Sequence, residues 1–262
     1  MKFQVLSILL AGVLVSGYAQ ETDGDSVKVS SPEKKNRSID IRIGEKSDST
    51  RKTSSKFSFQ LTLARLDLGL ATFTENGSFT FSSPQAQSLE YHRMKTNNVG
   101  LELLQTGYRF NSYFKIYLAA GLDWTHMRLK KNITPQPDQP VFTVIEEDID
   151  FKKNRFSSTY LRIPLSFQFR TKDDQKGNKF HFVAGPEIGF LLNGKTKQVS
   201  DERGKVKYKD DFNFNPFRYG AFARFGYDDI GLYVKYYAND VFADNQGPKD
   251  FKNLSFGLML GF

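Results

Sequence analysis

The sequence of 262 residues contains no cysteine. This absence excludes disulfide bonds, zinc sites with cysteine ligands and a lipid anchor on an N-terminal cysteine. Histidine is scarce too, with three residues in the chain. No stretch after residue 19 is apolar for the roughly 20 residues that a membrane-spanning helix needs. The sequence therefore argues against a helical membrane protein, and it predicts neither a cofactor nor a metal site.

The first 19 residues are typical of an export signal. Lys2 supplies the positive start, residues 3–15 form a short apolar core, and Gly17-Tyr18-Ala19 is a small-x-small cleavage site. We predict a signal peptide over residues 1–19. Residues 20–56 are rich in Ser, Lys, Asp and Glu, and this composition predicts a flexible periplasmic segment.

The end of the chain alternates between large apolar and small or polar residues. Leu254, Phe256, Leu258, Leu260 and Phe262 share one parity, and the residues between them are small or polar, apart from Met259. A period of two is typical of a β-strand. A half-apolar strand that ends on an aromatic residue fits the closing strand of a bacterial outer-membrane barrel, and the alternative is the last strand of a soluble sandwich.

Similar alternation recurs along the chain and predicts eight strands. They cover about residues 57–71, 99–110, 113–129, 157–170, 179–193, 217–227, 230–239 and 251–262. The phase slips near Ala64 and near Leu103-Leu104, which predicts a β-bulge at each place. Each strand is long enough for the roughly 9–11 residues of a tilted span. We predict an all-β fold over residues 57–262, an eight-stranded antiparallel up-and-down transmembrane β-barrel.

Two further patterns favour a membrane barrel over a soluble one. Short connections (111–112, 171–178, 228–229) alternate with long ones (about 73–97, 130–156, 194–215, 240–250), as expected if the two rims face the periplasm and the outside. The chain ends would then be periplasmic. Outward-facing aromatic residues gather near both predicted interfaces, in two girdles. The girdle residues are Phe114, Trp124, Phe167, Phe169, Phe180, Phe182, Tyr219, Phe225, Tyr227, Tyr236 and Phe262.

Three segments resemble a known family. Residues 160–165 (YLRIPL), 184–192 (AGPEIGFLL) and 254–262 (LSFGLMLGF) are similar to the PorT-like outer-membrane β-barrel family. The resemblance covers about residues 57–262 and implies a small outer-membrane barrel. It also implies one candidate role, as an accessory component of a protein-secretion system.

Charged residues lie at the positions that face the predicted barrel interior. They are Lys115, Asp123, Arg162, Arg170, Glu187, Arg218, Arg224 and Lys235. Side chains just fill the interior of an eight-stranded barrel, so we expect a paired charge network that closes the lumen. The alternative is a narrow ion path, as in a small porin-like channel.

The sequence offers little support for catalysis. A rim hydrolase would pair a serine with His92, His126 or His181, and no serine is placed convincingly for this. The carboxylates at 146–148 and 150 match no calcium-loop spacing, so we expect a solvated loop. The preferred function is a non-catalytic membrane scaffold whose long loops bind something or stabilise the envelope.

The net charge of +8 bears on the expected partners. A basic chain suits anionic lipid and the phosphates of lipopolysaccharide, and export makes nucleic acid the weaker expectation. Residues 194–209 contain several lysines and an arginine, and they are the clearest candidates for such contacts. Envelope or secretion-system proteins are the other expected partners.

Overall fold

The computed structural model describes residues 56–172 and 178–261, apart from the side chains of residues 60–64. These residues belong to the second of two units into which the chain divides, residues 38–262. The predicted signal peptide, nearly all of the predicted periplasmic segment and Phe262 lie outside the described residues. Among the described residues, helices of a length and hydropathy suited to crossing a membrane are not found.

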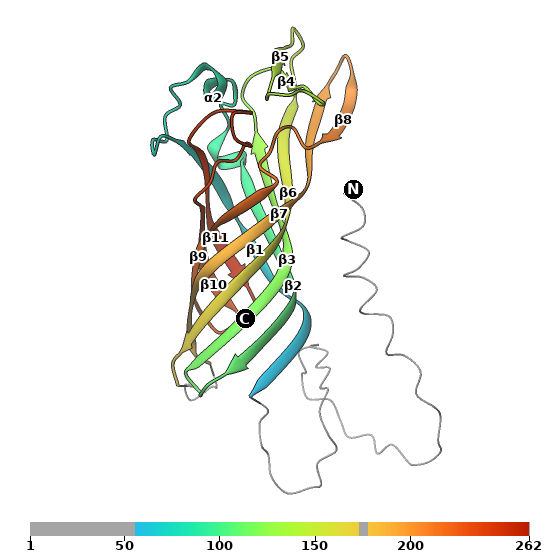
Figure 1. Ribbon diagram of the computed structural model, residues 1–262. Coiled ribbons are helices and arrows are strands. Elements are labelled where there is room, and N and C mark those ends of the chain that lie inside the picture. Colours follow the sequence, from blue (N-terminus) through green and yellow to red (C-terminus); the bar gives the residue numbers. More distant parts are fainter. Residues whose placement is uncertain (1–55, 173–177, 262) are drawn as a thin grey trace, which may run out of the picture. The chain divides into compact units, whose positions relative to one another are not determined.

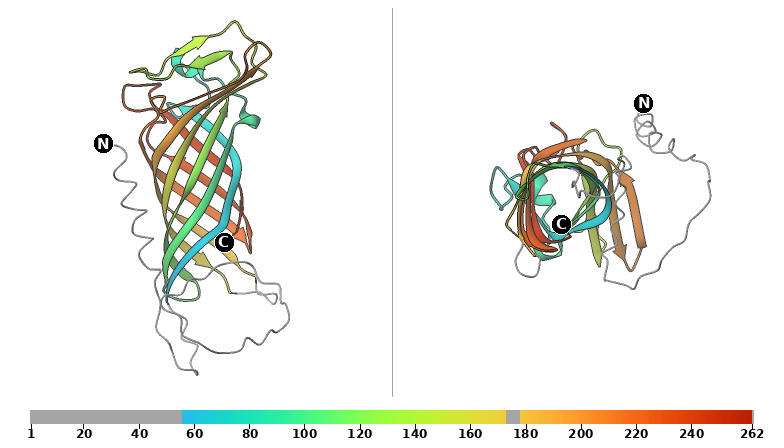
Figure 2. Two further views of the ribbon diagram at one scale, coloured as in Figure 1. Left: turned by 90° about the vertical axis from the view of Figure 1, so that its right-hand side faces the viewer. Right: turned by 90° about the horizontal axis from the view of Figure 1, so that it is seen from below.

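Eight long strands form one antiparallel meander. They are β1 (Phe57–Glu75), β2 (Asn97–Arg109), β3 (Phe114–Arg128), β6 (Lys153–Arg170), β7 (Phe180–Ser200), β9 (Phe217–Tyr227), β10 (Ile230–Tyr237) and β11 (Phe251–Leu260). Strands next to each other in this order are paired, and β11 pairs back onto β1. The hydrogen-bonded pairing therefore returns on itself through eight strands, and the end-on view shows the resulting ring (Figure 2).

Alternation along the strands separates an apolar outer face from a polar interior. Leu232 and Leu258 are more than half exposed on the outside, at 60% and 55%. The charged side chains of Arg162 and Lys235 are buried inside the ring. Because successive residues of a strand point to opposite faces, this one pattern both coats the wall with apolar groups and fills the interior with ionic ones.

The two predicted phase slips correspond to register shifts in the sheet. Between β1 and β2 the register changes between Leu61 and Arg65, and between β2 and β3 it changes between Glu102 and Leu104. The first shift leaves two extra residues on β1, and the second leaves one extra residue on β2. The phase of alternation changes at the shifts, and apolar side chains such as Phe59 and Leu68 are exposed on either side of the first one.

Several connections contain more structure than the sequence predicts. β7 continues to Ser200, where we expected a loop from 194, and pairs with an added strand, β8 (Gly204–Asp210). The first and fourth long strands also extend past their predicted ends, to Glu75 and back to Lys153. The reason is cross-strand pairing of polar residues, which a search for apolar alternation does not detect.

The long connections sit together at one end of the ring and form a crown (Figure 1). It includes the short helix α2 (Pro84–Ser88), the 3-10 turn η1 (Arg93–Lys95) and the small hairpin of β4 (Ile133–Pro135) and β5 (Val144–Glu146). The short connections lie at the opposite end (Figure 1).

Candidate functional site in the lumen

Arg162 on β6 is the centre of a buried charge network inside the ring. Its guanidinium donates to Asp67 at 2.9 Å and to Glu102 at 2.6 Å, and Glu187 lies 3.7 Å away. The Arg162 and Asp67 side chains are fully buried. A buried guanidinium is tolerated when carboxylates surround it, because the pairs offset the cost of removing both charges from water.

Two further cations join the same carboxylates from the far side of the ring. Lys235 on β10 lies 2.8 Å from Asp67 and 3.0 Å from Asp123, and Arg224 on β9 contacts Glu102. Strands β1, β2, β3, β9 and β10 therefore all contribute charged groups to one cluster. The contacts run across the lumen and connect opposite walls of the barrel.

Towards the crown, the network continues through an arginine stacked between two tyrosines. The guanidinium carbon of Arg218 lies 3.9 Å from the ring centroids of both Tyr160 and Tyr237, and its Nη2 donates to Asp123 at 2.7 Å. The Tyr237 hydroxyl in turn donates to Glu187. Cation–π contact and ion pairing together fix Arg218 in one orientation.

Towards the short turns, the network ends at Arg65 on β1. Its Nη1 donates to Glu102 and to the hydroxyl of Tyr117, at 3.2 Å for the tyrosine. Tyr117 packs in a small buried cluster with Val183 and Phe222. Apolar side chains therefore occupy the interior on this side of the charges.

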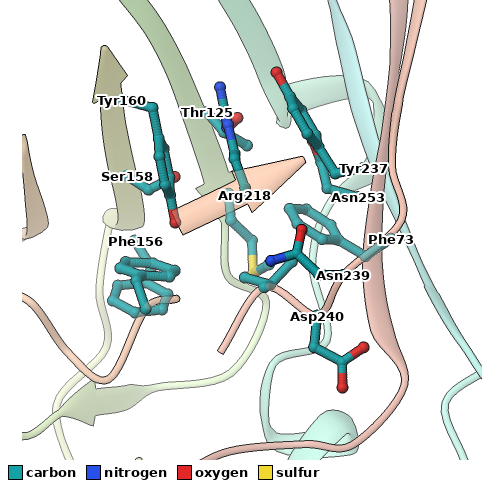
Figure 3. A pocket seen from close by; sticks show the side chains of 13 residues that line it. Phe73, Thr125, Phe156, Ser158, Tyr160, Arg218, Tyr237, Asn239, Asp240 and Asn253 are labelled. Atoms are coloured by element: carbon teal, nitrogen blue, oxygen red, sulfur yellow. The ribbon is translucent and has the colours of Figure 1, made fainter. Parts of the chain in front are cut away.

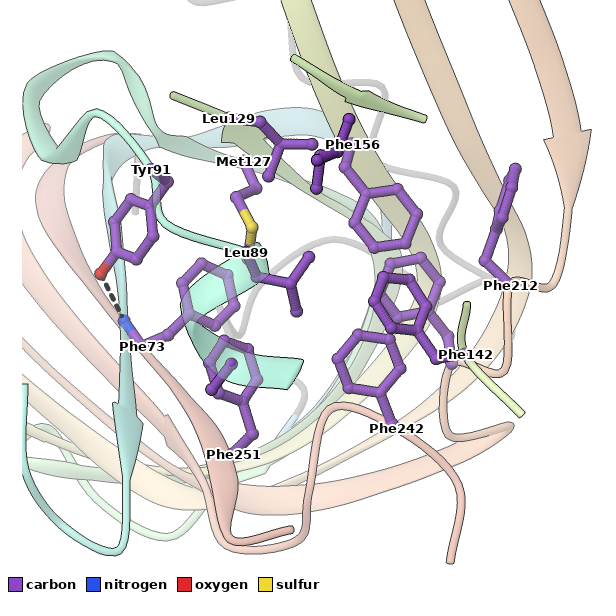
Figure 4. Close-up of a cluster of buried hydrophobic side chains, with 13 residues drawn as sticks. Phe73, Leu89, Tyr91, Met127, Leu129, Phe142, Phe156, Phe212, Phe242 and Phe251 are labelled. Atoms are coloured by element: carbon purple, nitrogen blue, oxygen red, sulfur yellow. Dashed lines mark hydrogen bonds between the residues drawn. The ribbon is translucent and has the colours of Figure 1, made fainter. Parts of the chain in front are cut away.

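A phenylalanine-rich core closes the interior on the crown side. Its members come from the strand ends and from all four long connections (Figure 4). They are Phe73, Ala86, Leu89, Tyr91, Met127, Leu129, Ile133, Phe142, Phe156, Phe212, Phe214, Phe242 and Phe251. We call this set the aromatic cap. Stacked and edge-on ring pairs, such as Phe156 with Phe214 at 4.7 Å, hold the connections to one another.

A small cavity lies between the charge network and the aromatic cap. Its volume is about 30 Å³, which is enough to admit a water molecule. Arg218, Tyr237 and Asn253 line it on one side, and Phe73 and Phe156 line it on the other (Figure 3). The interior is therefore packed on both sides of this cavity, and it resembles a protein core more than a channel.

The structure brings together six of the eight charged residues that we expected in the lumen, namely Asp123, Arg162, Glu187, Arg218, Arg224 and Lys235. The other two lie nearer the short turns. Lys115 is buried above the Tyr117 ring, and Arg170 is half-buried and donates to Gln168.

Sequence reasoning missed three residues at the heart of the network, Arg65, Asp67 and Glu102. All three are buried and paired. The signal was present, because Leu66, Leu68 and Leu101 face outward and their neighbours must then face inward. The two register shifts made this parity hard to follow at Arg65 and Glu102, which lie directly beside them.

Apart from Phe262, which lies outside the described residues, the aromatic residues expected in two girdles lie on the outer surface of the ring. Phe169, Phe180, Phe182, Phe225 and Tyr227 are exposed near the short turns, and Phe114 and Phe167 are half-buried there. Tyr219 and Tyr236 are exposed nearer the crown, and half-buried Trp124 lies on β3, across the ring from them.

The histidines occupy three different environments. His181 is buried in the interior, with Gln168 at 3.1 Å from its Nδ1, and His92 is exposed in the first long connection. His126 lies opposite Ser157 across β3 and β6. Among the hydrogen bonds of the described residues, none joins His126 to Ser157. The geometry needed to activate a serine is therefore not formed at His126.

The carboxylates of the second long connection take part in ordinary polar contacts. Glu147 accepts a hydrogen bond from Thr134 at 2.7 Å and pairs with Arg203 at 2.9 Å, and Asp150 accepts from Asn132 at 2.7 Å. Groups of acidic or histidine residues that could hold a metal ion are not found in the described part of the chain.

Comparison with known proteins agrees with this architecture. A family model described as outer membrane protein beta-barrel domain matches residues 11–242. The chain belongs to this family. Membership places the protein in the outer membrane, and the narrower PorT resemblance stays a prediction.

Among solved structures, the chain is similar to Ail, the attachment invasion locus protein of Yersinia pestis. The two share 14% identity over 78% of this chain and 95% of that one, with a TM-score of 0.33. A second structure of Ail, in complex with the heparin analogue sucrose octasulfate, matches with 14% identity over 78% of this chain and 96% of that one, at a TM-score of 0.31. No curated protein matches the chain.

Proposed function

We propose that this protein is a non-catalytic, closed outer-membrane barrel that presents a folded crown as a binding surface. In this proposal the eight-strand ring spans the bilayer, because its outer face is apolar at mid-height and aromatic near both ends. The crown lies outside the cell, since outer-membrane barrels carry their long connections there and their short turns in the periplasm. Both chain ends are then periplasmic.

The observation that carries the proposal is the filling of the interior. Arg162, Asp67 and Glu102 form a buried, paired cluster across the lumen, and the aromatic cap packs over it. A water-filled pore would need these charges to be hydrated and separated. The arrangement favours a scaffold over a small channel.

The crown is built to keep one shape. Gln198 on β7 donates to the Ile133 carbonyl and the Thr134 hydroxyl of β4, and Asn154 on β6 donates to the same carbonyl at 2.7 Å. Phe142 donates a backbone hydrogen bond to Gln246 from another connection. Loops held to one another in this way present a fixed surface, and a fixed surface binds a partner with little loss of conformational entropy.

Two measurements on the purified full chain test the proposal. In gel electrophoresis of outer-membrane fractions, we expect an unboiled band that migrates differently from the boiled one, as a folded barrel should. In planar bilayers, we expect no steady single-channel conductance. A stable conductance step in the wild-type protein would contradict the closed lumen, and recovery of the protein in the soluble fraction would contradict the membrane assignment.

A further inference from the structure

Strands β6, β7 and β8 extend beyond the ring and align cations in rows across one face. Arg128, Arg155, Lys197 and Lys207 are successive partners across four neighbouring strands. In the next row, Ser157 faces Lys195, and Lys195 faces Lys209. Directly opposite residues of antiparallel strands share a face, so these cations form one surface. We call Arg128, Arg155, Lys195, Lys197, Lys207 and Lys209 the basic face.

The basic face lies on the side of the sheet opposite to the aromatic cap. Residues of the opposite parity, such as Phe156 and Thr196, are buried on the other side, where Gln198 and Asn154 bind β4. The cations of the face are half-buried or exposed. The face is therefore open to a ligand from outside the barrel wall.

The cations of the basic face are not neutralised by the protein itself. Within the described residues, none of the six has a carboxylate oxygen within 4.0 Å, and the buried Nε of Arg155 has no hydrogen-bond partner. Lys153 lowers the pKa of Lys197, and Lys205 lowers the pKa of Lys207, through repulsion between like charges. Like charges placed directly opposite one another destabilise a sheet, so folding alone gives no reason for such rows.

A groove beside the basic face combines apolar and basic walls. It has a volume of about 400 Å³ and is lined by Val99 and Trp124 at one end and by Arg155, Lys195 and Lys209 at the other. Trp124 is paired with Thr159, and Arg155 lies four residues further along β6. Lys195 lies opposite Ser157, two residues from Thr159. At ~3.3 Å per residue, the cations therefore begin about 7 Å from the level of Trp124 and reach Arg155 at about 13 Å, a range that suits lipid headgroups next to an aromatic girdle.

We propose that this groove binds a phosphorylated lipid of the outer leaflet, with the phosphates of a lipid A-type headgroup on Arg155, Lys195 and Lys209 and an acyl chain against Trp124 and Val99. This proposal rests on the proposed function, because it needs the crown to lie outside the cell. Charge-assisted hydrogen bonds from arginine and lysine are strong on phosphate, and the apolar end selects a lipid over a free anion. A sulfated glycan would use the cations but would leave the apolar end unoccupied.

The single tryptophan of the chain makes the proposal directly measurable. Detergent-solubilised full-length protein is titrated with bisphosphorylated lipid A in the same detergent, and the fluorescence of Trp124 reports occupancy of the groove. Dephosphorylated lipid A and inorganic pyrophosphate are titrated in parallel. We expect half-saturation by the phosphorylated lipid at a concentration lower by about tenfold or more than for either comparison ligand.

A triple variant tests whether Arg155, Lys195 and Lys209 bind the phosphorylated lipid. R155Q/K195Q/K209Q should raise the half-saturation concentration by about tenfold or more, while removing repulsion within the sheet. The matched control K95Q/K131Q/K249Q removes the same charge from exposed residues elsewhere on the crown, and it should change affinity by less than about twofold. Both variants should keep the unboiled, folded band of the wild type.

Three outcomes would overturn the proposal. Equal losses in the two triple variants would mean non-specific attraction to net charge. Equal binding of dephosphorylated lipid would remove the role of phosphate. Pyrophosphate binding as tightly as the phosphorylated lipid would assign the face to a soluble polyanion. In each case a heat-modifiable band and an absence of conductance would leave the proposed function standing.

Discussion

Two groups of cations in this protein differ in the charges that surround them. In the lumen, Arg162 and Lys235 are buried, and carboxylates surround them. On the basic face, Lys197 lies between two cations, opposite Arg155 on one side and Lys207 on the other. The first group connects the walls of the barrel, and the second group repels itself. The comparison shows that position relative to the wall decides whether a charge in this fold stabilises the barrel or remains available for a ligand.

The largest effect is expected from breaking the centre of the lumen network. Arg162→Met leaves Asp67 and Glu102 with fewer cations inside a sealed interior. We expect a loss of about 3–5 kcal/mol in the free energy of unfolding, because a buried charge without its partner is strongly unfavourable. The free energy of unfolding is measured by urea titration in detergent, with the fraction of protein in the unboiled, folded band as the readout.

An exposed ion pair provides the control for Arg162. Arg203 pairs with Glu147 at 2.9 Å, but its side chain is 51% exposed. Arg203→Ala should cost less than about 1 kcal/mol. Similar losses for Arg162→Met and Arg203→Ala would show that burial does not set the strength of these pairs.

A smaller effect is expected from crowding the network without removing a charge. A Cβ atom on Gly100 would lie 2.9 Å from Nζ of Lys235 and 3.0 Å from Oδ2 of Asp67. Gly100→Ala should cost about 1–3 kcal/mol, since the paired groups must shift to admit the methyl group. A loss beyond that of Arg162→Met, measured by the same titration, would mean that packing outweighs pairing in the lumen.

The smallest effect, and one of opposite sign, is expected on the basic face. Like-charge neighbours lower the pKa of Lys197 and of Lys207 in the folded state. The unfolded chain then binds more protons as pH approaches the ordinary lysine value of about 10.4, so the free energy of unfolding should rise with pH in that range. K197Q/K207Q should be slightly more stable than wild type at pH 8. Its free energy of unfolding should also rise less with pH than that of the wild type.

Measuring the unfolding midpoint of both proteins from pH 8 to pH 10 checks this prediction. K95Q/K249Q, which removes two exposed lysines of the crown outside the basic face, is the control. A wild-type midpoint that falls with pH over this range, or a K197Q/K207Q protein less stable than wild type at pH 8, would contradict repulsion within the rows.

Much of the fold followed from local pattern. Alternation in residues 217–227 predicts β9 at its observed bounds, and the phase slips near Ala64 and Leu103 mark the two register shifts. The crown was harder to predict. Residues 194–200 and 204–210 form paired strands without apolar alternation, so their pairing depends on backbone hydrogen bonds and on the cap packed behind them.

The amino-acid sequence by itself determined the side of the wall on which each residue lies, because a strand has a period of two and the membrane and the lumen demand opposite polarity. It therefore determined that Arg162, Arg224 and Lys235 face inward. Only the tertiary structure decided that Arg162 meets Asp67 and Glu102, and that Arg155 lies in a row with Lys197 and Lys207. Such neighbours come from register between strands far apart in the chain, and register is set by closure of the whole ring.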